Sequence, residues 1–164
     1  MTELPAFPPP VLPLSILAQF AAVTALSDGV EEAVLDLVGP VWSKLGYVGG
    51  RLWRPDPAGE HLIPTAEWHP AERPAPTPTP VALGGPSLLG QCWAQNRIEW
   101  VAWTNWEDGR SRPEAYVCVP LAAGDDVLGV LELAGESTDE PPPDLAALLT
   151  KLGRRLGKLA AAQE

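Results

Sequence analysis

Two apolar runs joined by a short polar turn place the strongest constraint on the fold of this chain. Residues 115–121 (AYVCVPL) alternate between two faces, which is the pattern of a strand in a sheet. The turn at 123–126 (AGDD) follows, and residues 127–134 (VLGVLELA) return as a nearly all-apolar run. A strand without alternation is buried on both faces. We therefore expect 127–134 to be a central strand of a sheet that is covered on both sides.

An amphipathic helix is predicted after this hairpin, beginning at the turn Pro141-Pro142-Pro143-Asp144. Its leucines recur at heptad spacing: Leu145, Leu149, Leu152, Leu156 and Leu159. One interpretation is packing on the sheet or on the first helix, and the other is a dimer seam. The run covers about two heptads, fewer than the roughly three to four that indicate a coiled coil. We favour intramolecular packing and keep shared use as the alternative.

The rest of the chain divides into short elements bounded by Gly and Pro. Apolar residues at helical spacing predict a helix over 14–26, and Asp28 with Glu31 has the spacing of a capping box at the start of a second helix. That helix is expected to kink or break at Gly39-Pro40. The remaining predicted elements are strands at 47–54, 61–68 and 98–103, a short helix at 87–96 with Ser87 as its N-cap, and a polar loop at 104–113.

Proline divides the chain into folded and extended parts. The 20 prolines cluster, and the clusters predict an extended arm over 1–13 and a polyproline-like loop over 70–80. Residues 14–164 are then expected to form a single domain, a length that suits one hydrophobic core.

Charge and composition exclude several classes of partner. The net charge of −10 argues against a phosphate-binding surface, so no nucleic-acid partner is expected. No apolar run is long enough to span a bilayer, and the N-terminus lacks the positive residues of a secretory signal, so we expect a cytoplasmic protein without a membrane partner. Cys92 and Cys118 are expected to be reduced, buried thiols. His61 and His69 do not form a metal-ligand set, so no metal or cofactor is expected.

Several segments resemble the GAF domain family. GGPSLLGQCW at 84–93 resembles the segment that leads into the family's middle helix, and IEWV at 98–101 resembles the strand after it. VPL at 119–121, Gly124 and VLGVLEL at 127–133 resemble the family's hairpin, and 144–157 resembles its closing helix. These motifs are structural, so they indicate a fold more directly than an activity.

The resemblance implies an α+β fold of the GAF type, which is related to PAS. That fold has an antiparallel sheet of five or six strands with helices on its faces, and its first and last helices pack side by side. In the family these helices often pair between subunits, and the opposite face of the sheet often carries a small-molecule pocket. The resemblance therefore implies a homodimer and names a candidate interface: Leu145, Leu149, Leu152, Leu156, Leu159, Ile16 and Phe20.

Four residues near the implied pocket are candidate ligand contacts: Trp100, Trp103, Tyr116 and Cys118. Tryptophan has a large apolar face and a polar N–H, which suits a small apolar or aromatic ligand. The alternative is that these rings fill the cavity themselves.

The resemblance to catalytic members of the family fails at their cysteines. GAF enzymes that reduce free methionine sulfoxide need several cysteines, including one before the hairpin, and this chain has only Cys92 and Cys118, with none in 104–113. We therefore expect a non-catalytic sensory or regulatory domain that binds a small molecule in signal transduction. The alternatives are a ligand-free dimerisation or scaffold module and, less favoured, a thiol-dependent enzyme of the methionine sulfoxide reductase type.

Overall fold

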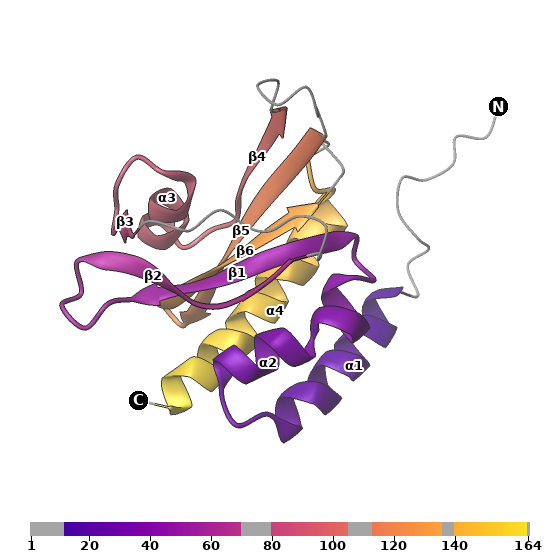
Figure 1. The fold of residues 1–164 in the computed structure, drawn as a ribbon. Coiled ribbons are helices and arrows are strands. Elements are labelled where there is room, and N and C mark those ends of the chain that lie inside the picture. The colour runs from indigo at the N-terminus through magenta and orange to yellow at the C-terminus, as the bar shows by residue number, and fades with distance from the viewer. Residues whose placement is uncertain (1–11, 70–79, 105–112, 136–139, 164) are drawn as a thin grey trace.

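A six-stranded antiparallel sheet organises the molecule (Figure 1). The computed structural model describes residues 12–69, 80–104, 113–135 and 140–163, so most of the predicted arm, the proline-rich loop and the polar loop lie outside the described residues. The strand order is β3-β2-β1-β6-β5-β4. The strands are β1 (Tyr47–Pro55), β2 (His61–Trp68), β3 (Val81–Ala82), β4 (Glu99–Thr104), β5 (Pro113–Ala123) and β6 (Asp126–Gly135).

The all-apolar strand lies in the centre of this sheet, as predicted. β6 pairs with β1 on one side and with β5 on the other. Pro64 of β2 lies opposite Trp53, next to a register shift between Leu52 and Trp53. β3 pairs with β2 only at His61 and Leu62, so the backbone at Pro64 is not needed as a donor on that side.

Helices cover both faces of the sheet unequally (Figure 1). One face carries α1 (Leu12–Leu26), α2 (Val30–Asp36), the π-helix η1 (Val38–Trp42) and α4 (Pro143–Ala162), and the other carries α3 (Leu88–Gln95). α4 packs along β5 and β6, α2 contacts α4, and α1 contacts α2 and η1. The terminal helices therefore share one helical layer, in which α1 is the outer member.

The leucine seam of α4 packs inside the chain. Leu149, Leu152 and Leu156 are at most 1% exposed, Leu145 is 9% exposed, and Leu159 is partly buried against the same core. Ile16 and Phe20 of α1 belong to this core as well. These side chains therefore pack within one chain, as the favoured interpretation predicted. They offer no free surface to a partner, so a homodimer remains a prediction that needs another face.

Several local expectations about the first helices were wrong. α1 begins at Leu12, inside the predicted arm, because a proline at position 13 is tolerated in the first turn of a helix. Leu26, the last apolar residue of the predicted helix, is 86% exposed at the helix end. α2 begins at Val30 without a side-chain cap of its own, and the Asp28 N–H donates to Glu32 rather than to Glu31.

Two helix features have identifiable causes. The break expected at Gly39-Pro40 takes the form of η1, whose wider π-helical winding accommodates a proline that cannot donate a backbone hydrogen bond. The N-terminus of α2 is capped from far away in the sequence, since the Val30 N–H donates to Oε1 of Gln163 at 3.1 Å. The C-terminal end of α4 is therefore tied to the start of α2.

Candidate functional site

α3 encloses a second, smaller apolar cluster on its face of the sheet. The helix begins where Oγ of Ser87 accepts a hydrogen bond from the Gly90 N–H at 3.0 Å, which confirms the predicted N-cap. It ends at Asn96, which adopts a left-handed conformation with φ of 51°. We call its buried members the α3 cluster: Trp53, Leu62, Leu89, Cys92, Cys118 and Val130.

A row of polar side chains crosses the sheet on the same face. The strand registers place five residues directly opposite one another on five neighbouring strands: Glu67, Arg51, Glu132, Cys118 and Glu99. Directly opposite residues of antiparallel strands share a face, so we call this set the cross-sheet row. Arg51 Nε pairs with Glu67 Oε2 at 3.0 Å, and Arg97 Nε pairs with Glu99 Oε1 at 3.0 Å. The outer carboxylates of the row are thus ion-paired.

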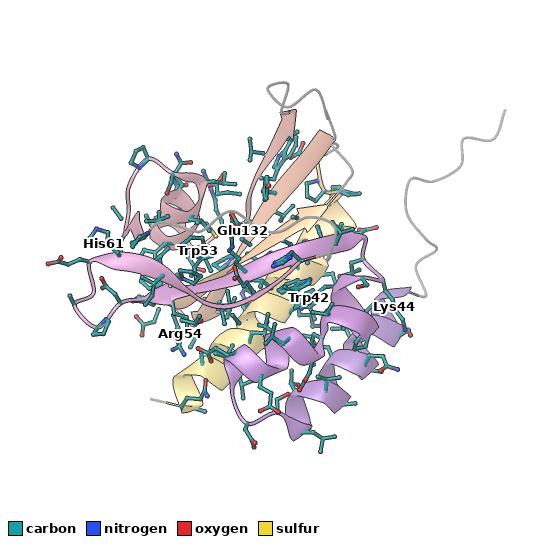
Figure 2. All side chains as sticks on the ribbon, in the orientation of Figure 1. Trp42, Lys44, Trp53, Arg54, His61 and Glu132 are labelled. Atoms are coloured by element: carbon teal, nitrogen blue, oxygen red, sulfur yellow. The ribbon has the colours of Figure 1, made fainter. Side chains whose placement is uncertain are left out.

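Glu132, in the middle of the row, is the carboxylate that lies beside the α3 cluster. The indole Nε1–H of Trp53 donates to its Oε1 at 3.3 Å, and Figure 2 shows the two side chains next to each other. Burial raises the pKa of Glu132, while the hydrogen bond from Trp53 and the charge of Arg51 act in the opposite direction. The charged form of such a carboxyl group is stabilised by a ligand that donates a hydrogen bond to it or carries a positive charge.

Two residues further along the strands from Glu132, the side chains on the same face of the sheet are more exposed to solvent. Tyr116 lies opposite both Ala134 and Val101, two residues along each strand from the cross-sheet row. Tyr116 and Ala134 are half-buried, whereas Val101 is 42% exposed. We call Glu132, Trp53, Tyr116, Ala134 and Val101 the site face. It carries a carboxylate and two aromatic side chains, and one of these, Tyr116, lies opposite the exposed Val101.

The structure separates the four residues predicted to contact a ligand. Tyr116 and Cys118 lie on the α3 side of β5. Trp100 lies opposite Val117 and packs against the core under α1 and α4, on the other face of the sheet. Its grouping with the pocket was wrong because successive residues of a strand point to opposite faces. The side chain of Trp103 lies outside the described residues.

The two thiols are buried in the α3 cluster. Both are free, and both are 0% exposed. Burial, with a smaller contribution from Glu99, raises the pKa of Cys92 to about 12. Burial also raises the pKa of Cys118, to which the charge of Glu132 adds. A thiol is nucleophilic as its thiolate, so these surroundings suit structural cysteines rather than reactive ones.

Sequence reasoning missed the residues at the centre of this site. Trp53, Arg51, Glu99 and Glu132 were not candidates, yet one signal for Glu132 was present in the sequence. Residues 127–134 were expected to be covered on both faces, and Glu132 is the charged residue within that run. A charge in a doubly covered strand must be buried near a partner or a ligand, which marks it as a functional candidate.

Two features are absent from the described residues. Within residues 12–69, 80–104, 113–135 and 140–163, no group of three or more His, Cys, Asp or Glu side chains is arranged to hold a metal ion. Among the helices in those ranges, none combines the length and the apolar character needed to cross a membrane.

Comparison with known families identifies the fold. The model of the GAF domain matches residues 30–159, which is most of the chain. The chain belongs to the GAF domain family. No curated protein sequence matches the chain significantly. This GAF domain also carries its α3 cluster and site face on the side of the sheet where the resemblance placed a pocket.

Solved structures share the GAF fold at low sequence identity. A free methionine-R-sulfoxide reductase from Neisseria meningitidis, in complex with its substrate, is 20% identical, with a TM-score of 0.73 over 99% of this chain and 96% of that one. The GAF domain of an Acinetobacter phosphoenolpyruvate-protein phosphotransferase is 16% identical, with a TM-score of 0.69 over 92% and 93%. A methyl-accepting chemotaxis protein segment is 16% identical, with a TM-score of 0.61 over 90% and 96%.

The first of these structures corrects one prediction. The chain was expected not to be an enzyme, on the ground that its cysteines depart from those of catalytic GAF proteins. A reductase nevertheless matches nearly the whole of this chain, so the fold is one that supports enzymatic activity as well as sensing. The absence of a cysteine set was too narrow a basis for that prediction, because it concerns one chemistry and not the fold.

Proposed function

We propose that this GAF domain is a sensory or regulatory module that binds a small molecule over the site face. GAF domains commonly have such roles, and the solved structures with this fold include a segment of a chemotaxis protein. The single observation that carries the proposal is the placement of Glu132. Its carboxylate lies beside the α3 cluster and accepts a hydrogen bond from Trp53, on the same face of the sheet as Tyr116 and the exposed Val101.

Keeping the Glu132 carboxylate in this partly buried position costs free energy. Removing a carboxylate from water is unfavourable unless hydrogen bonds or opposite charges compensate. Trp53 supplies one hydrogen bond of 3.3 Å, and the neighbouring Arg51 is ion-paired with Glu67. A chain selected for stability alone would place an apolar residue in this strand. Groups held at such a cost cluster at functional sites.

The chemistry of the site face defines the class of ligand. Tyr116, Val101 and Ala134 present aromatic and aliphatic surface, which suits a small molecule with an apolar or aromatic body. Glu132 accepts hydrogen bonds and prefers a positive partner. We propose a ligand that joins an apolar or aromatic body to a nitrogen that donates a hydrogen bond or carries a positive charge.

A thermal-shift screen with a matched pair of variants tests this function. The screen would include aromatic and aliphatic amines, amino acids, nucleobases and their neutral or acidic analogues. A ligand at one hundred times its Kd stabilises the native state by about 2.7 kcal/mol. We expect compounds with a basic or donating nitrogen to raise the Tm of the wild-type chain, and Glu132→Gln to weaken the best of them at least about tenfold.

Glu67→Gln is the control, because it makes the same chemical change at the exposed end of the cross-sheet row, where the side chain is 44% exposed. It should leave ligand affinity unchanged. A screen in which no compound raises the Tm would count against the function. A compound that binds Glu132→Gln as well as it binds the wild type would move the site elsewhere.

A further inference from the structure

α4 carries a continuous patch of positive charge on its outer side. Its inner side packs on β5 and β6, where Leu149, Leu152 and Leu156 are buried. The basic side chains of the helix lie on the opposite side, and all of them are exposed: Lys151, Arg154, Arg155 and Lys158. We call these four residues the basic patch. At 3.6 residues per turn they fall within about 100° around the helix axis and within about 10 Å along it.

The basic patch is unusual because its cations have no carboxylate partners. The sequence has 21 acidic and 11 basic residues, so carboxylates are available in excess. The arginines in or beside the sheet each have one: Arg51 pairs with Glu67, Arg54 with Glu31, and Arg97 with Glu99. Within the described residues, by contrast, no member of the basic patch forms an ion pair.

The members of the basic patch also repel one another. Residues three or four positions apart are neighbours on the surface of a helix. Lys151 is three residues from Arg154 and four from Arg155. Lys158 is four residues from the first of these arginines and three from the second. Each cation therefore has two like charges beside it, which destabilises the helix. Glu placed among the cations would remove this repulsion, so stability does not explain the patch.

The dipole of the helix does not explain the basic patch either. Cations are favoured in the last turn of a helix, and the effect falls off beyond that turn. α4 ends at Ala162, and its last turn contains no basic residue. Lys158 lies next to that turn, but the other members of the patch lie about two to three turns from the helix end. A negatively charged partner is what would make this arrangement favourable.

The charge of the rest of the chain limits the extent of that partner. The net charge of −10 includes the four positive charges of the patch, so the remainder of the chain carries −14. Charges act over about 8 Å at physiological ionic strength. A nucleic acid or an anionic membrane extends well beyond the patch and would be repelled by that remainder. A short acidic segment of a protein would meet the patch alone.

A membrane partner is disfavoured on a second ground. An amphipathic helix binds a bilayer by inserting its apolar side between the lipids. The apolar side of α4 is occupied by the sheet, because Leu149, Leu152 and Leu156 belong to the main core. The basic patch could therefore contact lipid headgroups only through its charges.

We propose that the basic patch of α4 docks an acidic segment of a partner protein. A helix with Glu or Asp three and four residues apart presents carboxylates at the spacing of the patch. Arg154 and Arg155 each offer two parallel N–H donors to a carboxylate. Lys151 and Lys158 supply point charges on either side of them. The proposal does not depend on the ligand site at Glu132, which lies on the other face of the sheet.

Fluorescence anisotropy with a labelled acidic peptide tests the proposal on the full chain. The probe is a short helical peptide with Glu at positions i, i+3, i+4 and i+7, and its control is the same peptide with Gln at those positions. The wild-type chain should bind the Glu peptide at least about tenfold more tightly than the Gln peptide. The affinity for the Glu peptide should fall as salt is added.

Lys151→Glu and Lys44→Glu form a matched pair, because both replace an exposed lysine and change the net charge equally. Lys151→Glu should weaken binding of the Glu peptide more than about tenfold. It should also raise the Tm, because it turns two like-charge pairs, with Arg154 and Arg155, into opposite-charge pairs. Lys44 lies outside α4, so Lys44→Glu should weaken binding less than about twofold. A loss of affinity with a gain in Tm excludes unfolding as its cause.

Four results would overturn the proposal. Equal weakening by Lys151→Glu and Lys44→Glu would show an effect of net charge alone. Equal affinity for the Glu and Gln peptides would show that the patch does not recognise carboxylates. Tighter binding of a short DNA duplex or of phosphatidylserine vesicles, lost in Lys151→Glu, would assign the patch to a nucleic acid or a membrane. Tighter binding of a labelled second copy of the chain, lost in the same variant, would make the patch a contact between copies.

Discussion

Trp53 and Glu132 are joined across neighbouring strands by a hydrogen bond from the indole Nε1–H to the carboxylate Oε1, 3.3 Å long. Trp53 belongs to the α3 cluster, and Glu132 belongs to the cross-sheet row. The bond therefore links the apolar and the charged parts of the site. A ligand that engages Glu132 would change the surroundings of the Trp53 indole directly.

Replacing Glu132 with Gln should change how stability depends on pH. Burial raises the pKa of Glu132 above its unfolded value, so the native chain keeps this proton to a higher pH than the unfolded chain does. Wild-type stability should therefore fall as pH rises from the ordinary carboxyl pKa through the native pKa. Glu132→Gln should lack this loss, be more stable than wild type at pH 7, and approach it below pH 4. Urea denaturation at a series of pH values measures both.

The same series with Glu67→Gln separates this effect from a general loss of negative charge. Glu67 is ion-paired with Arg51 at the exposed end of the row, so its removal should give no gain in stability at pH 7. If Glu132→Gln were less stable than wild type at neutral pH, the Glu132 carboxylate would stabilise the folded chain. That result would contradict the claim that keeping this carboxylate lowers stability.

The thiols should be inert in the native state. Cys92 and Cys118 are fully buried, and burial raises the pKa of both. A disulfide reagent at pH 8 should therefore react with neither thiol in the folded chain and with both in guanidinium, where the ordinary Cys pKa returns. Release of one equivalent of chromophore within seconds from the native chain would show that the α3 cluster opens.

Strand periodicity predicted the sheet better than the site. The alternation in 115–121 and its loss in 127–134 led correctly to β5 and to a central β6, because burial on one or both faces leaves a direct pattern. The same alternation would have put Trp100 and Trp103 on opposite faces, because they are three residues apart in one predicted strand. Grouping tryptophans by sequence neighbourhood ignored it, and so the predicted ligand set was split between two faces.

Other features depend on contacts that no local pattern records. The cap of α2 comes from Gln163, 133 residues away, so the local Asp28 and Glu31 spacing was a poor guide. The row of Arg51, Glu132 and Glu99 exists only once the registers of β1, β6, β5 and β4 are fixed. Registers follow from turn geometry and packing across the sheet, which a single sequence specifies only indirectly.

Gly157→Ala should destabilise the chain although Ala is the better helix former. A Cβ at Gly157 would overlap the backbone of Ala122, because α4 lies directly on β5 at this point. Overpacking of this kind costs about 1–3 kcal/mol. The matched change is Gly39→Ala in η1, where an added Cβ meets nothing within 4 Å. Pro40 follows directly and disfavours a helical conformation for a preceding residue with a Cβ, so Gly39→Ala should not stabilise the chain, but it should cost less than Gly157→Ala. Chemical denaturation compares the two, and equal effects would contradict the close packing of α4.

Gln163→Ala should weaken the start of α2. Its Oε1 accepts the Val30 N–H at 3.1 Å, and Gly29 lies so close that an added Cβ would overlap the Gln163 amide. Loss of a cap costs about 1 kcal/mol. Hydrogen exchange should accelerate at the first amides of α2. Lys158→Ala, exposed on the same helix, should leave these amides unchanged, and equal exchange in both variants would show that the tie contributes nothing.

The most direct test of ligand binding at the site face follows the indole N–H signals of the seven tryptophans by NMR. The Trp53 signal is identified by its absence in Trp53→Phe, and that of Trp42 by Trp42→Phe. The Trp42 indole donates to the Val34 carbonyl at 2.9 Å in the main core, a different cluster from that of Trp53, and serves as the internal reference. Adding the best compound from the screen should move the Trp53 signal in proportion to saturation and leave the Trp42 signal in place. A compound that stabilises the chain without moving the Trp53 signal would contradict a ligand site at Glu132.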